Sequence, residues 1–242
     1  MDEIGLNELL QLVISDKGGK SQQYRQLMDY IAYHETGPVA QGLPDQRMDP
    51  KARQYTYDQK LKKYVQDGRG RGLFMYEAGE GGSANSAVNR LYKYLTQVKN
   101  VDAPQWVENL TGQNKNVDVS KLDEDQQKML FLADHRMRDG SNFSKVWSGE
   151  QDFSEFWTYS HWRGNNPTQE LIQEKMNLFD ASMTHKDSTD AVRELELEQM
   201  YKNNLAPYLS LENQPQKLPS EKTITDIIFG NDTSAILNRL NK

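Results

Sequence analysis

The chain has 242 residues, a formal net charge of -6 and a sequence pI near 5.3, and it contains no cysteine. Disulfide bonds and thiolate metal sites are therefore excluded, and the acidic balance argues against nucleic acid as the main ligand. The same balance is unfavourable for an enzyme that acts on an anionic polymer, unless its site is locally basic.

Length and hydropathy predict one domain of ordinary size with appendages. The mean hydropathy of -0.87 is polar for a compact globule, so part of the chain is expected to be tail or partner-dependent surface. The N-terminus is acidic and lacks the basic region of a signal peptide. Its longest apolar run is Leu12–Ile14, which is far too short to span a membrane.

The first segments are predicted to be helical. Residues 1–15 place Leu6, Leu9, Leu10 and Val13 on one face, and a break follows at residues 17–20. Residues 1–19 are thus interpreted as an N-terminal helix and linker, residues 20–185 as the main domain, and residues 186–242 as a C-terminal helix, linker and docking tail.

Residues 21–37 predict an amphipathic helix that ends near Glu35. Its apolar positions follow i, i+3, i+4, i+7 and i+8 spacing, Ser21 is a suitable cap, and Pro38 disfavours continuation. Glu35 falls about three turns after Tyr24, on the apolar face and in the last turn. Burial and the negative end of the helix dipole both disfavour the charged form, as a general acid requires. The alternative is a half-exposed Glu at a frayed helix end.

Residues 37–72 are predicted to be irregular, with one short helix carrying Tyr57, Leu61, Tyr64 and Val65. This is the most basic region of the chain, and tyrosines alternate with its basic residues. It is interpreted either as the lining of a groove for an anionic glycan or as a solvated basic surface. The basic residues are Arg47, Lys51, Arg53, Lys60, Lys62, Lys63, Arg69 and Arg71.

A short apolar run, Gly72–Glu77, leads into a glycine-rich turn and a further helix that Ser83 is expected to cap. The turn lacks the Gly-Lys-Ser/Thr ending of a P-loop, so a nucleotide site is not expected. The face predicted to be buried on this helix consists of Ala84, Ala87, Val88, Leu91, Leu95 and Val98.

The remaining chain is also predicted to be mainly helical. Residues 100–119 are expected to be a connector. A capping box at Ser120–Asp123 then opens a helix that runs to about Met137, and a turn follows at Asp139–Asn142. Helices are also expected after Pro167 and over residues 188–205, followed by a linker and two docking segments, residues 224–229 and 235–240. Because strand signals are few, the predicted fold class is mainly α.

An aromatic cluster lies between these helices. It is interpreted either as platforms for sugar faces or as core packing. Its members are Phe143, Trp147, Phe153, Phe156, Trp157, Tyr159 and Trp162.

The acidic residues fit glycoside cleavage better than the other chemistries considered. His34-Glu35 lacks the second histidine of His-Glu-x-x-His because position 38 is proline, so no metal or other cofactor is expected, and no Gly-x-Ser-x-Gly is present. Glycoside cleavage needs one protonated carboxyl, which Glu35 supplies, and a second carboxylate or help from the substrate. Candidates for the second carboxylate are Glu77, Glu80 and Asp49.

The order of motifs resembles the lysozyme-like superfamily of soluble lytic transglycosylases and goose-type lysozymes. A helix ends in His34-Glu35-Thr36-Gly37, and after an insertion the run from Gly70 to Glu77 precedes another helix. The resemblance implies that Glu35 is the catalytic acid, and that the floor and substrate-binding residues are Gly72, Leu73, Phe74, Met75, Tyr76 and Glu77. Met75 stands where the family commonly has Gln. The third family motif, Ala-Tyr-Asn, aligns with Ala133-Asp134-His135, which makes His135 a substrate-binding candidate.

Over roughly residues 20–165 the motifs are also similar to lysozyme-like proteins of tailed bacteriophage virions. This resemblance implies a virion enzyme, a lytic transglycosylase or muramidase, that opens the peptidoglycan of the host cell wall during genome entry and contacts other virion proteins through its tail. One alternative is a structural virion protein that uses the fold as an assembly module. Another is a free endolysin made for host lysis.

Overall fold

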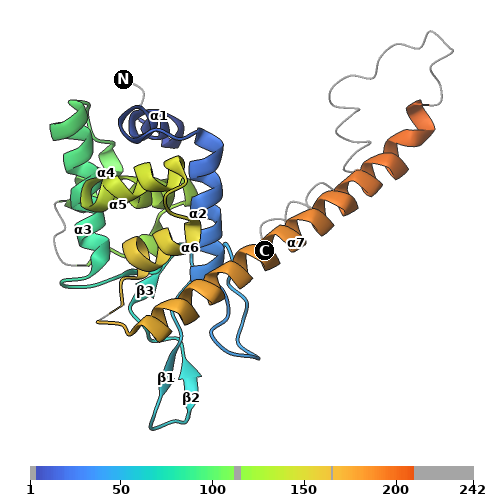
Figure 1. Cartoon of the computed structure of the whole chain (residues 1–242), viewed down its shortest axis with the longest axis horizontal. Coiled ribbons are helices and arrows are strands. Elements are labelled where there is room, and N and C mark those ends of the chain that lie inside the picture. Colours follow the sequence, from blue (N-terminus) through green and yellow to red (C-terminus); the bar gives the residue numbers. More distant parts are fainter. Residues whose placement is uncertain (1–3, 112–115, 165, 210–242) are drawn as a thin grey trace. The chain divides into compact units, whose positions relative to one another are not determined.

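The computed structural model describes residues 4–111, 116–164 and 166–209, and the backbone alone from residue 201 on. It is 63% helical and 6% strand, which confirms the mainly α prediction. The chain divides into two compact units, Met1–Thr184 and His185–Lys242 (Figure 1). The α-helices are α1 (Leu6–Lys17), α2 (Ser21–Glu35), α3 (Ser83–Lys93), α4 (Gln105–Thr111), α5 (Glu124–Ser148), α6 (Phe153–Phe156) and α7 (Gln169–Leu209).

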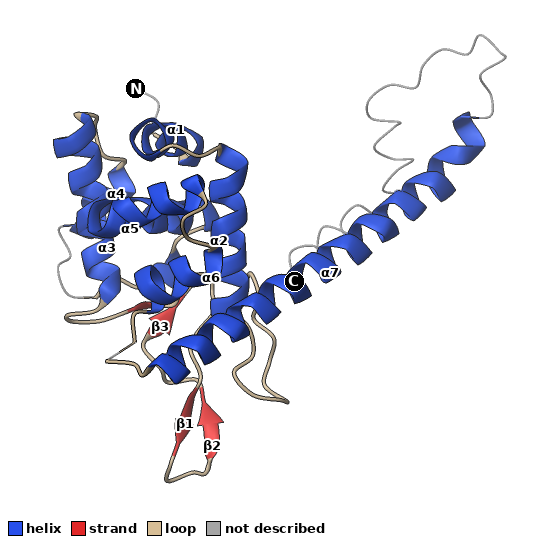
Figure 2. Ribbon diagram, viewed as in Figure 1, coloured by secondary structure: helices blue, strands red, loops and turns tan. Residues whose placement is uncertain are grey.

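Shorter elements connect these helices. Two antiparallel hairpins, β1–β2 and β3–β4, lie between α2 and α3 (Figure 2). Three short helical segments follow: two π-helical ones, Tyr94–Lys99 and Trp157–Trp162, and one 3-10 turn, Val119–Lys121. The strands are β1 (Thr56–Asp58), β2 (Lys63–Val65), β3 (Gly70–Arg71) and β4 (Tyr76–Glu77).

The core of the first unit is built from the apolar faces of its helices. Helix α5 packs on α1 and α3, and α3 packs on α4. The predicted face of α1 is buried throughout, as are the α2 residues Tyr24, Leu27, Met28, Ile31 and Ala32. These faces form because the 3.6-residue period aligns their apolar side chains along one side of each helix.

The two ends of α2 are fixed by polar contacts. At its start Lys20, rather than Ser21, is the cap residue, and its backbone N–H donates to Gln23 Oε1 at 2.9 Å. At its end the Thr36 hydroxyl donates to the Ala32 carbonyl at 2.6 Å and accepts from the Met48 N–H at 2.9 Å. The loop after α2 is thus tied to the last helical turn, which carries Glu35.

The prediction of a short helix around Tyr57–Val65 is wrong, because this segment forms the β1–β2 hairpin (Figure 1). Tyr57 pairs with Tyr64 across the strands, and their ring centroids lie 5.3 Å apart. Thr, Tyr and Val favour strands, and Lys62 adopts φ 51° in the turn between them. A helix here would have no core to bury its apolar face, so the local β propensity decides the structure.

Three further helix boundaries differ from the predictions. Helix α3 widens into the π-helical segment at Tyr94, which turns Val98 outward to 47% exposure. Helix α4 lies within the segment predicted to be a connector. Helix α5 is capped by Asp123, which accepts from the Gln126 N–H, rather than by Ser120.

Helix α5 also continues through the predicted turn to Ser148, with non-helical backbone at Asp139 (φ -153°, ψ 43°). The Asp139 carboxylate accepts hydrogen bonds from Asn142, Ser160 and Arg163. These contacts connect the kink in α5 to the segment Trp157–Trp162.

One helix, α7, replaces the two helices predicted after Pro167. In its first turns Phe179 is fully buried and stacks on Trp157 at 5.3 Å. Across the described residues, no helix combines the length and apolar character needed to cross a membrane. The proposed docking segments at 224–229 and 235–240 lie outside the described residues.

Candidate active site

Glu35, the last residue of α2, lines a cavity of about 290 Å³. Its side chain is 18% exposed, so the carboxyl is largely withdrawn from water but still reachable from the cavity. Helix α2, the β3–β4 hairpin, α5 and the segment Trp157–Trp162 all contribute to the walls. The lining residues are Glu35, Gln54, Phe74, Met75, Tyr76, Glu77, Ser83, Arg138, His161 and Trp162.

The Glu35 carboxyl has one short hydrogen bond. Trp157 Nε1–H donates to Glu35 Oε1 at 2.6 Å, and Trp157 is only 3% exposed. Burial raises the pKa of the Glu35 carboxyl to about 7, and the Trp157 hydrogen bond opposes that rise. About half of the carboxyl groups are therefore protonated at pH 7, and the protonated fraction rises below that pH. Because Oε1 already accepts from the indole, that proton resides on Oε2.

Two neutral histidines lie behind the carboxyl. His161 Nε2 is 3.7 Å from Glu35 Oε1, and His161 Nδ1 is 3.1 Å from His135 Nε2. Burial, with Arg138 nearby, lowers the pKa of His161 to about 3, and burial also holds the pKa of His135 well below its usual value. Since neither ring carries charge near pH 7, neither imidazole forms an ion pair with Glu35.

A buried carboxylate on α5 contacts two residues of the cavity wall. Asp134, with a side chain 2% exposed, accepts from the Tyr76 hydroxyl at 3.2 Å and from Arg138 Nη2 at 3.0 Å. It also pairs with Arg90 of α3. Burial and the Asp134 charge keep the pKa of Tyr76 well above 10, so the phenol stays neutral and acts as a donor.

The segment predicted to form the floor has two layers. Phe74, Met75, Tyr76 and Glu77 line the cavity, and Phe74 stacks on Phe131 at 4.5 Å.

The other two predicted floor residues, Gly72 and Leu73, are buried beneath this layer. The Leu73 N–H donates to Gln127 Oε1 at 2.8 Å, and Gly72 has φ 70°. A Cβ on Gly72 would lie 2.2 Å from the same Gln127 oxygen. Gly72 therefore supports the floor through close backbone packing rather than through contact with the cavity.

His135 is placed differently from the implied substrate contact. It is fully buried and is not among the cavity-lining residues. Its ring packs on Phe131 at 4.3 Å and contacts the cavity-lining residues His161 and Arg138. His161 lies within the aromatic cluster that the sequence shows. Its contact with Glu35 could not be predicted, because the two residues are far apart in the sequence and share no motif.

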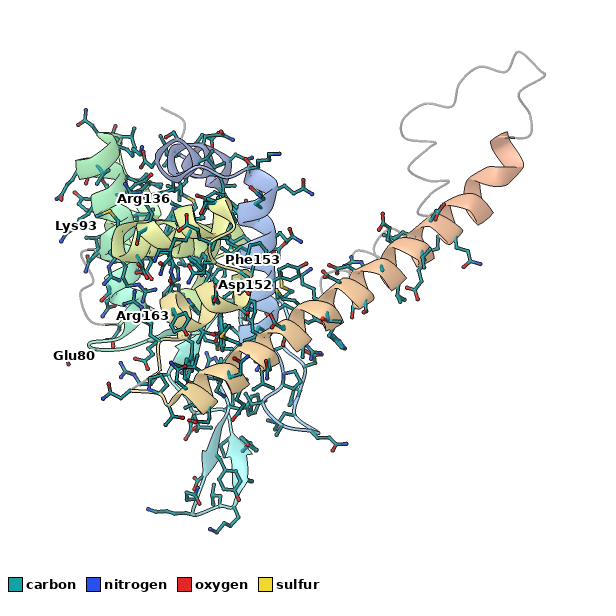
Figure 3. All side chains as sticks on the ribbon, viewed as in Figure 1. Glu80, Lys93, Arg136, Asp152, Phe153 and Arg163 are labelled. Atoms are coloured by element: carbon teal, nitrogen blue, oxygen red, sulfur yellow. The ribbon has the colours of Figure 1, made fainter. Side chains whose placement is uncertain are left out.

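Of the three candidates for a second carboxylate, Glu77 alone lines the cavity. Its side chain is 57% exposed and lies 4.0 Å from Arg69 Nη1. Asp49 instead accepts from the Lys51 backbone N–H at 2.8 Å, and Figure 3 shows Glu80 at the outer edge of the molecule, pointing to solvent.

The basic loop and the aromatic cluster contribute less to the cavity than the sequence suggested. From residues 38–70 only Gln54 lines it. Phe143, Phe156 and Trp157 are buried in the core, whereas Trp162 stacks on Trp157 at 6.2 Å and faces the cavity. Core packing is thus confirmed for the three buried members, and a sugar platform stays a prediction that only Trp162 is placed to fulfil.

Within the part of the chain that the structure describes, no group of three or more His, Asp or Glu side chains is arranged to hold a metal ion. Comparison of the chain with protein-family models, with curated proteins and with solved structures finds no match.

Proposed function

We propose that this chain cleaves the β-1,4 bond between N-acetylmuramic acid and N-acetylglucosamine in peptidoglycan, with Glu35 as general acid. The observation that carries the proposal is a carboxyl with a pKa of about 7 in the wall of a cavity. A glycosidase needs such a protonated carboxyl at the leaving oxygen. The motif order around Glu35 and Gly72–Glu77, which resembles lytic transglycosylases and goose-type lysozymes, supports the choice of substrate.

In the first step Glu35 Oε2 gives its proton to the glycosidic oxygen as the bond to the anomeric carbon breaks. The carboxylate that forms is stabilised by the Trp157 Nε1–H on Oε1, because a donor favours the charged form of its acceptor. Glu35 then acts as base. It accepts a proton from water in a muramidase, or from the muramic acid's own hydroxyl in a lytic transglycosylase, as the oxygen that loses this proton bonds to the anomeric carbon. Glu77 is the candidate for a second carboxylate in the same cavity.

The setting we propose is a bacteriophage particle, in which the protein opens the host wall locally during genome entry. The similarity of residues 20–165 to virion-associated lysozyme-like proteins supports this part. The proposed contacts with other virion proteins fall on residues 210–242, outside the described residues. A free endolysin would instead be absent from purified particles. Mass spectrometry of those particles therefore distinguishes a virion protein from an endolysin.

The test is the variant Glu35→Gln, because Gln keeps the shape of the side chain and an oxygen for the Trp157 donor but carries no acidic proton. Dye release from purified peptidoglycan should fall to background, while the melting curve at pH 4 should match the wild type. Glu80→Gln is the matched control, since this exposed carboxylate lies outside the cavity, and it should keep full activity. Retained activity in Glu35→Gln would refute the assignment. A wild-type protein that clears no wall would favour the structural alternative.

A further inference from the structure

The cavity carries a local surplus of positive charge in an acidic protein. Besides Glu35, the charged side chains that line it are Glu77 and Arg138. Glu77 has Arg69 4.0 Å away, so that pair is close to neutral. Two guanidinium groups, Arg138 in the wall and Arg90 outside the lining, share the single Asp134 carboxylate. One positive charge is therefore left unneutralised beside the cavity, although the chain as a whole has a net charge of -6.

Arg138 is the member of this cluster that reaches the cavity. Its side chain is 22% exposed, and Nη2 is the nitrogen that contacts Asp134 and the neutral His135 ring. Its Nε–H is buried without a hydrogen-bond partner, and the head-group contacts in the described part of the chain all use Nη2, which leaves the Nη1 donors for a ligand in the cavity. A guanidinium has five N–H donors in a planar fork that matches a carboxylate, so Arg138 keeps donor capacity for an anion.

Asp134 does not depend on Arg138 alone. It keeps Arg90 and the Tyr76 hydroxyl as partners if the Arg138 guanidinium turns toward a ligand. An arginine that is needed only to neutralise Asp134 would be redundant here, because Arg90 already supplies that charge. The arrangement fits a guanidinium that is held at the cavity wall and shared with a ligand.

We propose that Arg138 binds a carboxylate of the muramic acid unit, so that the cavity selects carboxylate-bearing amino sugars over neutral ones. This inference rests on the proposed function and names the feature of the substrate that the site recognises. It also accounts for how an acidic protein can act on an anionic polymer, since the positive charge lies where the substrate binds.

The test compares two sugars that differ by one group. N-acetylmuramic acid and N-acetylglucosamine share the ring and the acetamido group, and only the first has the lactyl carboxylate. Binding is followed by NMR titration in the Glu35→Gln background, in which nothing is cleaved. We expect N-acetylmuramic acid to bind about tenfold more tightly, the effect of one charge-assisted hydrogen-bonding contact, and the preference to fall as salt is raised.

Adding Arg138→Gln should remove the preference, and Arg138→Lys should restore part of it. Arg136→Gln is the matched control, because this arginine lies on the same helix with the same 22% exposure but pairs with Asp16 and does not line the cavity, so it should keep the preference. Melting curves of all three variants check folding. The carboxylate that Arg138 binds could be that of the lactyl group or of the peptide attached to it. N-acetylmuramyl-L-alanine, in which the lactyl carboxylate is amidated and the alanine carboxylate is free, distinguishes these two. Retained preference assigns Arg138 to a peptide carboxylate, and lost preference assigns it to the lactyl group.

Equal affinity for the two sugars, or an equal loss of preference in Arg138→Gln and Arg136→Gln, would overturn the inference. These outcomes are separate from failure of the proposed function. A protein that clears peptidoglycan but binds both sugars equally keeps the function and loses the role of Arg138. A protein that prefers N-acetylmuramic acid but clears no wall keeps the binding preference and loses the enzymatic proposal.

Discussion

Replacing Glu35 by Gln should change how the stability of the protein depends on pH. Burial raises the pKa of the folded-state carboxyl to about 7, from 4.5 for an ordinary Glu. Because the folded state binds this proton more tightly than the unfolded state, its contribution to stability is fully present below pH 4.5 and is lost as the pH rises to 7. With about 1.4 kcal/mol for each pKa unit, the loss is about 3 kcal/mol above pH 7. Gln does not ionise, so the variant lacks this loss.

The measurement is urea unfolding of both proteins between pH 4 and pH 8, followed by tryptophan fluorescence. The free energies of unfolding should be similar at pH 4, and the variant should become the more stable protein by up to about 3 kcal/mol at pH 8. Glu80→Gln should show a flat difference from the wild type, since that side chain is exposed. A flat difference for Glu35→Gln as well would show that the carboxyl titrates normally, and the proposed general acid would lose its physical basis.

Two further predictions concern the neighbours of the carboxyl. Trp157→Phe removes the donor to Glu35 Oε1, a charge-assisted bond of about 1.5 kcal/mol, so the pKa of Glu35 should rise by about one unit further and move the alkaline limb of the activity profile upward. Trp147→Phe is the control. Trp147 packs against Tyr24, about three helical turns before Glu35 on α2, so this variant should leave that limb unchanged. Gly72→Ala should lower the free energy of unfolding by about 2 kcal/mol in thermal melts, through positive φ and a 2.2 Å clash. Gly18→Ala has a similar φ but no atom within 4 Å of the added Cβ, so it should lower the free energy of unfolding by less. Equal losses in the two variants would show that Gln127 moves away from the new Cβ at little cost.

Local periodicity was sufficient for the elements whose environment follows from their own residues. Helix α1 and helix α2 have apolar stripes that match a helical period, and the structure buries the residues that the pattern selects. The position of Glu35 on the inner face of its last turn follows from the same period. The partial burial and the raised pKa of the carboxyl also agree with this derivation.

The partners of Glu35 were not accessible to this reasoning, because they come from distant parts of the chain. Trp157 lies 122 positions away, and nothing in its local pattern distinguishes it from the aromatic residues that only fill the core. Arg138 lines the cavity one residue before α5 kinks at Asp139. That kink depends on hydrogen bonds to Ser160 and Arg163, which are made only in the folded chain.

The choice of Glu at position 35 has a stability cost that the fold does not require. A glutamine there would accept the same hydrogen bond from Trp157 and would carry no ionisation penalty, so it would be the more stable residue above pH 7. The Trp157 ring that donates to Glu35 also stacks on Phe179 of α7. Local conflicts of this kind concentrate at sites where chemistry, rather than stability, determines the residue. The energetic cost of Glu35 and its position in the cavity wall therefore both fit the proposed role as general acid.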